Sequence, residues 1–80
     1  MNPRTPQDHE AQLLLGRAIR RLRNERGASQ EALAKGAGIT PNMLSLIERG
    51  HGNPSWVTLR GLATALGISV AELAKAAEDT

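Results

Sequence analysis

The segment that begins at Ser29 and ends at Gly50, SQEALAKGAGITPNMLSLIERG, limits what this 80-residue chain can fold into more than any other feature. Ser29 predicts a helix start, because its hydroxyl can accept a hydrogen bond from a first-turn N–H that has no helical partner. Thr40 and Pro41 predict a second start, since proline at the first helical position forgoes no hydrogen bond. Gly38 favours a tight turn with positive φ between the two helices. Two short helices joined so closely must cross steeply.

Apolar residues at helical spacing give each of these helices one side to bury. Leu33, Ala34 and Ala37 lie on one side of the first helix, and Leu44 and Ile47 mark the buried side of the second. This pattern is the helix-turn-helix arrangement, in which the second helix presents an outward face to the DNA major groove.

Four runs carry a more specific pattern: Ser29-Gln30-Glu31-x-Leu33-Ala34, Gly38-Ile39-Thr40, Leu44-Ser45-x-Ile47-Glu48-Arg49-Gly50 and Asn53-Pro54-Ser55. In them the chain resembles the Cro/C1-type (lambda-repressor-like, XRE) helix-turn-helix proteins. The pattern continues through Leu59 and 62–67, so that the resemblance covers roughly residues 14 to 77. It implies a five-helix domain.

The remainder of the chain also reads as helical. A long helix is predicted from Pro6 to Arg26, ended by Gly27, with apolar residues at 3–4 spacing that form one stripe toward the core. Gly16 and Gly61, both inside predicted helices, are suited to close helix packing. Residues 1–5 read as a flexible leader, and residues 6–80 as one helix-turn-helix domain.

Two more helices are predicted after the motif. Ser55 caps one that runs to about Leu66, with apolar positions at Val57, Leu59, Leu62, Ala63 and Leu66. Ser69 and Glu72 form a capping box for a last helix that runs to about Ala77. No strand alternation is visible, so that the fold class is all-α.

Composition argues against several functions. The chain has no cysteine, and His9 and His51 are far apart in sequence, so neither a disulfide nor a metal centre is expected. No Ser/His/Asp set or Gly-rich phosphate loop is present, which predicts no catalytic residue, no cofactor and no enzyme. No apolar run is long enough for a bilayer and no signal peptide is visible, which favours a cytoplasmic protein without membrane contact, nucleoid-associated when bound to DNA.

Charge is distributed unevenly, although the formal net charge is only +2. Five arginines lie close together with only Glu25 against them: Arg17, Arg20, Arg21, Arg23 and Arg26. Acids gather near both ends of the chain. A cationic middle suits a polyanionic partner, although a solvated helix face accounts for the same pattern.

The resemblance implies which residues meet DNA. It assigns base or groove contacts to the start of the second motif helix, at Pro41, Asn42, Ser45 and Leu46, with Met43 nearby. Thr40 is counted with them among the DNA-binding residues. Asn42 can offer a donor and an acceptor to adenine, and Ser45 can take either role. Pro41 and Leu46 depart from the polar residues of many relatives. Leu46 can contact a thymine methyl, face a protein partner or extend the core.

Other residues are assigned supporting roles. The resemblance implies that Gln30 hydrogen-bonds a DNA phosphate at a helix N-terminus, where free N–H groups and the helix dipole favour an anion. It places Arg49, His51 and Asn53 near the DNA backbone as well, with Arg17 and Arg20 adding charge at longer range or simply solubility.

Two features bear on architecture rather than on reading DNA. The resemblance pairs Arg23 with Glu48 as a partly buried structural ion pair that fixes the recognition helix. Trp56 is the sole aromatic residue and is expected at the edge of the core, with a dimer interface as the alternative. The last helix and the Trp56 region are the first candidates for a dimer surface.

The sequence therefore predicts a transcription regulator that binds double-stranded DNA as a homodimer on a palindromic operator, with repression as the default mechanism and activation as the alternative. Two recognition helices would then lie about one helical turn apart, roughly 34 Å. A protein-interaction module that kept the fold and lost specific DNA binding is the competing hypothesis, supported by Leu46, Pro41 and the modest charge.

Overall fold

Five helices make up the computed structural model, which describes residues 6–80. They are α1 (Pro6–Glu25), α2 (Gln30–Ala37), α3 (Pro41–Glu48), α4 (Trp56–Leu66) and α5 (Val70–Glu78). No strand occurs in this part of the chain, which confirms the all-α, five-helix prediction. The leader predicted for residues 1–5 lies outside the described residues.

The predicted caps set the helix boundaries. Ser29 Oγ accepts from Ala32 N at 3.0 Å, and Thr40 Oγ1 accepts from Met43 N at 3.1 Å. Ser55 does the same for Thr58. Gly38, with φ of 74°, ends α2 in the left-handed conformation that a side chain disfavours. Three helices differ from prediction: α1, α5 and α3, which was predicted at about residues 40–49 and spans Pro41–Glu48.

Those differences are one residue each. α1 ends at Glu25 instead of Arg26, because the N–H of Arg26 lies between the carbonyls of Leu22 and Arg23, at 3.2 Å from each, as the helix tightens. α5 continues to Glu78, one residue beyond the predicted end.

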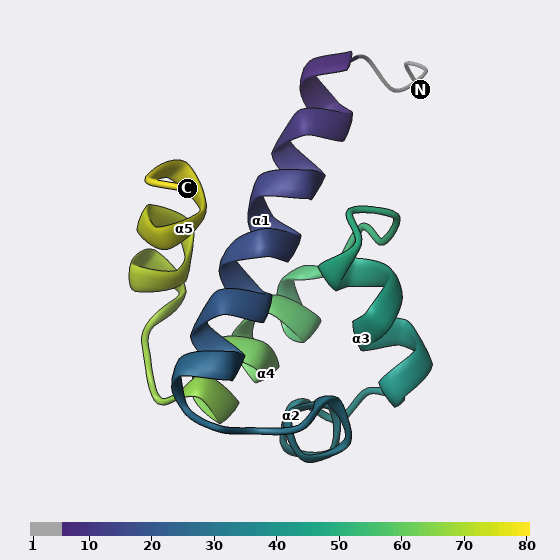
Figure 1. Ribbon diagram of the computed structural model, residues 1–80, viewed down its shortest axis with the longest axis vertical. Coiled ribbons are helices and arrows are strands. Elements are labelled where there is room, and N and C mark those ends of the chain that lie inside the picture. The colour runs from purple at the N-terminus through teal and green to yellow at the C-terminus, as the bar shows by residue number, and fades with distance from the viewer. Residues whose placement is uncertain (1–5) are drawn as a thin grey trace.

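The helices surround one small core. Figure 1 shows α1 as the central long helix, with α3 and α5 on opposite sides of it and α2 and α4 near its C-terminal end. The buried cluster draws on every helix: Ile19, Leu33, Ala34, Leu44, Ile47, Leu62, Ala63, Leu66 and Leu73.

Two glycines allow helices to approach closely, as the sequence predicted. A Cβ on Gly16 would lie 2.7 Å from the carbonyl oxygen of Glu48, and closer still to that of Ile47, so α1 meets the backbone of α3. A Cβ on Gly61 would lie 2.6 Å from the carbonyl oxygen of Ala37, where α4 crosses α2. Any side chain at these positions would push two helices apart.

The expectation that Trp56 closes the core was wrong. Its side chain is 62% exposed, and Val57, predicted as an apolar position of the same helix, is 78% exposed. The buried residues of α4 are Leu62, Ala63 and Leu66, all in its later turns. The first turn therefore projects beyond the surface that the other helices cover.

Within residues 6–80, no single helix is long and apolar enough to cross a membrane. α4 and α5 reach that length and composition only together, and the chain bends by 92° between them.

Candidate nucleic-acid interface

The outer face of α3 gathers most of the residues that were assigned to DNA. Thr40, Pro41, Asn42, Met43 and Leu46 are all exposed there, while Ser45 is half-buried. Leu46 is 40% exposed and Met43 46%. The option that Leu46 extends the core is therefore wrong, and this side chain is available for contact with a partner.

The inner face of α3 is buried and carries the only acid of the helix. Leu44 and Ile47 enter the core, and Glu48 is buried beside them. Because Glu48 points inward, the outer face of α3 presents no carboxylate to a polyanion. Such an arrangement favours the approach of a phosphate backbone.

Glu48 is neutralised by the residue that the resemblance paired with it. Arg23 Nε donates to Glu48 Oε2 at 2.7 Å and Arg23 Nη2 to Oε1 at 3.1 Å, which is a two-pronged pair between α1 and α3. The side chains are 11% and 2% exposed. The hydrogen bond to Glu48 raises the pKa of Arg23 further above its ordinary range, against the opposing effect of burial.

The same network holds neighbouring backbone. Arg23 Nη1 donates to the carbonyl oxygen of Ala28 at 2.9 Å, which anchors the turn before α2. Arg23 thus connects α1, the start of α2 and α3. In the described residues no buried side-chain nitrogen or oxygen lacks a hydrogen-bond partner, so the burial of this charged pair is compensated.

Gln30 has a contact that the sequence did not predict. Its Nε2 donates to Glu48 Oε1 at 3.0 Å, and the side chain is half-buried. The amide is therefore held against α3, with its carbonyl oxygen left as an acceptor. The spacing of residues in the sequence does not predict this hydrogen bond, because the bond depends on how steeply α2 and α3 cross.

Three further residues lie past the end of α3. Arg49 caps the helix and its Nε donates to the carbonyl oxygen of Ser45 at 3.3 Å; His51 and Asn53 follow in the loop, and all three are exposed. The fold also brings His9 of α1 to His51, with ring centroids 6.3 Å apart, although sequence distance had separated them. No group of three metal-ligating side chains occurs among the residues that the structure describes.

A shallow groove runs beside the exposed apolar residues of α3. It measures about 330 Å³ and lies between α3 and the loop that leads to α4. Met43 and Leu46 line one wall, and Asn53, Pro54 and Thr58 line the other. The sequence suggested Asn53 for the DNA backbone but gave no reason to expect Pro54 or Thr58 beside α3.

Comparison with known proteins settles the family. Residues 14–76 match the family model described as "Helix-turn-helix domain". The chain belongs to this helix-turn-helix family. The resemblance to Cro/C1-type regulators is thereby confirmed, and solved structures that are similar to the chain include an HTH_3 family transcriptional regulator from Vibrio cholerae.

Relatives of known name agree with this assignment. The HTH-type transcriptional regulator y4dJ of Sinorhizobium fredii is 42% identical over 67 residues, which is 84% of this chain and 87% of the relative. The immunity repressor of Bacillus phage phi105 is 39% identical over 61 residues, 76% of this chain but only 42% of that longer protein.

Solved structures share the fold closely. The restriction-modification controller protein C.AhdI from Aeromonas hydrophila superimposes with a TM-score of 0.76 and 40% identity, covering 78% of this chain and 94% of the other. The clp gene regulator ClgR from Corynebacterium glutamicum gives a TM-score of 0.83 at 33% identity, covering 86% and 73%.

Proposed function

We propose that the protein is a transcription regulator that reads double-stranded DNA as a homodimer on a palindromic operator, acting as a repressor. It would act in the cytoplasm, at the nucleoid. The observation that carries this function is the division of α3 into two faces. Its one acid is buried against Arg23, while Asn42, Met43 and Leu46 are exposed on the other face. The family of the chain, and relatives named as repressors, support the same function.

Each part of the surface has a role in this proposal. Asn42 hydrogen-bonds a base edge in the major groove, and Ser45 and Thr40 contact bases or nearby phosphates. The backbone N–H groups at the starts of α2 and α3 approach phosphates, as helix N-termini favour anions. Gln30, whose amide nitrogen is bonded to Glu48, offers its remaining N–H to a phosphate. Arg49, His51 and Asn53 contact the backbone on the other side of α3.

The deciding experiment is selection of bound duplexes from a random DNA pool, followed by affinity measurements over a range of salt. A palindromic motif is expected, with affinity that falls steeply as salt rises. Arg49→Ala should weaken binding to all sequences and lower the salt slope by about one. Asn42→Ala should relax preference at one base pair per half-site, at a cost of about 1–3 kcal/mol. Lys75→Ala, on the exposed surface of α5, is the matched control and should change neither the affinity for DNA nor the base preference.

A protein-interaction module remains the second candidate, because Met43 and Leu46 expose apolar surface beside a groove. The same experiment separates the two. Retention of no DNA even at low salt would reject the regulator and favour the module.

A further inference from the structure

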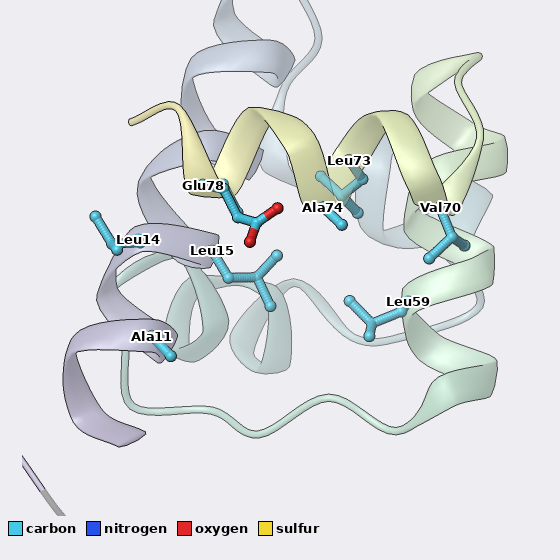
Figure 2. A pocket seen from close by; sticks show the side chains of 9 residues that line it. Ala11, Leu14, Leu15, Leu59, Val70, Leu73, Ala74 and Glu78 are labelled. Carbon is cyan, nitrogen blue, oxygen red and sulfur yellow. The ribbon is translucent and has the colours of Figure 1, made fainter. Parts of the chain in front are cut away.

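An apolar groove lies on the opposite side of α1 from α3. It has a volume of about 370 Å³ and is formed by α1, α4 and α5, as Figure 2 shows. Leu14 and Leu15 form one wall, Leu59 and Val70 another, and Ala74 widens the groove because its side chain is small. Glu78 is the one charged residue that lines it, and its carboxylate extends from α5 toward Leu15.

An exposed apolar ridge lies immediately beside this groove. Trp56 precedes Leu59 by three residues on α4, so both side chains point to similar sides of the helix. Val57 is 78% exposed but lies two residues before Leu59, so it points to another side of α4. Trp56 is 62% exposed. One turn further along the same face, Arg60 is exposed as well. A large exposed apolar side chain, Trp56, thus projects at the edge of the apolar groove on one surface.

We propose that a second copy of this chain occupies the groove, with Trp56 of each copy inserted into the groove of the other. A two-fold interface places the same patch on both subunits, so that patch must be complementary to itself. A knob beside a hollow meets this requirement, whereas a groove alone does not. Tryptophan is also the residue type most enriched among the side chains that dominate interface energetics.

The charges on the two parts are complementary. Arg60 is the charged residue of the ridge, and Glu78 is the charged residue of the groove. When the ridge of one copy lies in the groove of the other, Arg60 faces the partner copy's acidic rim. Such pairs fix register and exclude wrong partners more than they add affinity.

This surface is compatible with reading DNA. No residue of α3 lines the groove, and α3 and α5 lie on opposite sides of α1 in Figure 1. A partner in the groove therefore leaves both recognition helices uncovered. The inference rests on the proposed homodimer and adds its interface.

The chain contains its own probe, because Trp56 is the sole aromatic residue and no tyrosine or phenylalanine contributes to its fluorescence. The test measures sedimentation and tryptophan emission of the full chain over a range of concentration. As dimer forms, the emission maximum should move to shorter wavelength in parallel with the mass. A dimer whose emission does not change would overturn the inference.

Substitutions test both halves of the surface. Trp56→Ala and, from the groove side, Ala74→Gln should each weaken dimerisation by at least about tenfold. Both positions are exposed, so the fold should persist, and far-UV circular dichroism checks that it does. Met43→Ala removes a large exposed side chain from α3 and should leave dimerisation unchanged. Unaltered dimerisation of Trp56→Ala would overturn the inference.

Charge reversal tests the register. Arg60→Glu and Glu78→Arg should each weaken the dimer by several-fold, and the double variant should recover it, since the opposite charges meet again. No recovery would reject the pairing that we infer.

Binding to a single half-site separates this inference from the proposed function. Trp56→Ala should lose affinity for the palindrome yet bind an isolated half-site as the native chain does. If the native chain does not bind an isolated half-site, that result would instead count against the reading of DNA, whatever the oligomeric state. A chain that stays monomeric at every concentration but binds a half-site would overturn the interface and the proposed homodimer, but not the reading of DNA.

Discussion

α3 and α5 both pack against α1, but different forces hold them there. Besides the buried Leu44 and Ile47, α3 is fixed by the ion pair with Arg23, by the amide of Gln30 and by backbone contact at Gly16. α5 is held by apolar side chains, the buried Leu73 and the partly buried Val70, and its capping box stabilises only its own first turn. Along its side runs the apolar groove, which none of the residues that the structure describes fills.

The difference shows how the molecule separates two tasks. Hydrogen bonds and close backbone contact are directional, so they set both the position and the rotation of α3. Apolar packing is less directional, and around α5 it leaves surface for another chain. Of these two helices, the one proposed to read bases is therefore the more strictly placed.

The strongest test of this contrast removes Glu48. Glu48→Ala should lower the free energy of unfolding by about 3–5 kcal/mol, because the partly buried guanidinium of Arg23 would lose its carboxylate partner. Urea unfolding measures the loss. Glu25→Ala is the matched control: Glu25 pairs with Arg21 on the exposed surface of α1, and its loss should cost about 0.5 kcal/mol or less. Equal losses for the two variants would mean that the buried network does not hold α3.

The glycine contact gives the next largest effect. Gly16→Ala should destabilise the fold by about 1–3 kcal/mol, since its Cβ would overlap the carbonyl oxygens of Ile47 and Glu48. The sign of the change in stability is informative, because alanine is intrinsically a better helix former than glycine by about 1 kcal/mol. Thr64→Ala, at an exposed position of α4, should be neutral or slightly stabilising in the same urea titration. A stabilised Gly16→Ala variant would show that α1 and α3 have room to separate.

The outer face of α3 can be tested by removing single methyl groups from DNA. If Leu46 contacts a thymine methyl, replacing that thymine by uracil in the selected operator should cost about 0.8 kcal/mol per half-site. Leu46→Ala should lose most of this sensitivity, whereas Met43→Ala should retain it. Binding isotherms for the native chain and Leu46→Ala, each with the thymine and the uracil operator, give the coupling energy directly. Equal sensitivity of the native chain and Leu46→Ala would assign Leu46 another role.

Local chemistry predicted the helices well. Ser29, Thr40, Ser55 and Ser69 each accept a backbone N–H within their own first turn, so their effect can be read from a few neighbouring residues. The family pattern also placed Arg23 opposite Glu48. These features depend on short segments or on a known motif.

What could not be predicted depends on how the helices cross. Trp56 reads as core by residue type, but no other helix covers the first turn of α4, and only tertiary structure shows this. The hydrogen bond from Gln30 to Glu48 joins α2 to α3, and the spacing of these residues in the sequence does not predict that the two side chains meet. His9 and His51 meet for the same reason.

The smallest expected effect concerns the cap of α5. The hydrogen bonds with Ser69, the backbone N–H first and the hydroxyl second, lower the pKa of Glu72 below its ordinary 4.5. The ionised form is therefore the one that stabilises the fold: its contribution is complete above pH 4.5 and is lost as the pH falls through the lower, folded-state pKa.

Glu72→Gln should slightly lower the melting temperature at pH 7 and remove part of the acid dependence below pH 4.5. Glu31→Gln, in the first turn of α2, is the control, because the third position of that helix is Ala32, which cannot complete a capping box. Since Glu72 is exposed and lies on α5, loss of its carboxylate should leave the position of α3 and the affinity for DNA unchanged, whereas Glu48→Ala should impair both. A loss of DNA affinity in Glu72→Gln would show that the two sides of α1 are coupled.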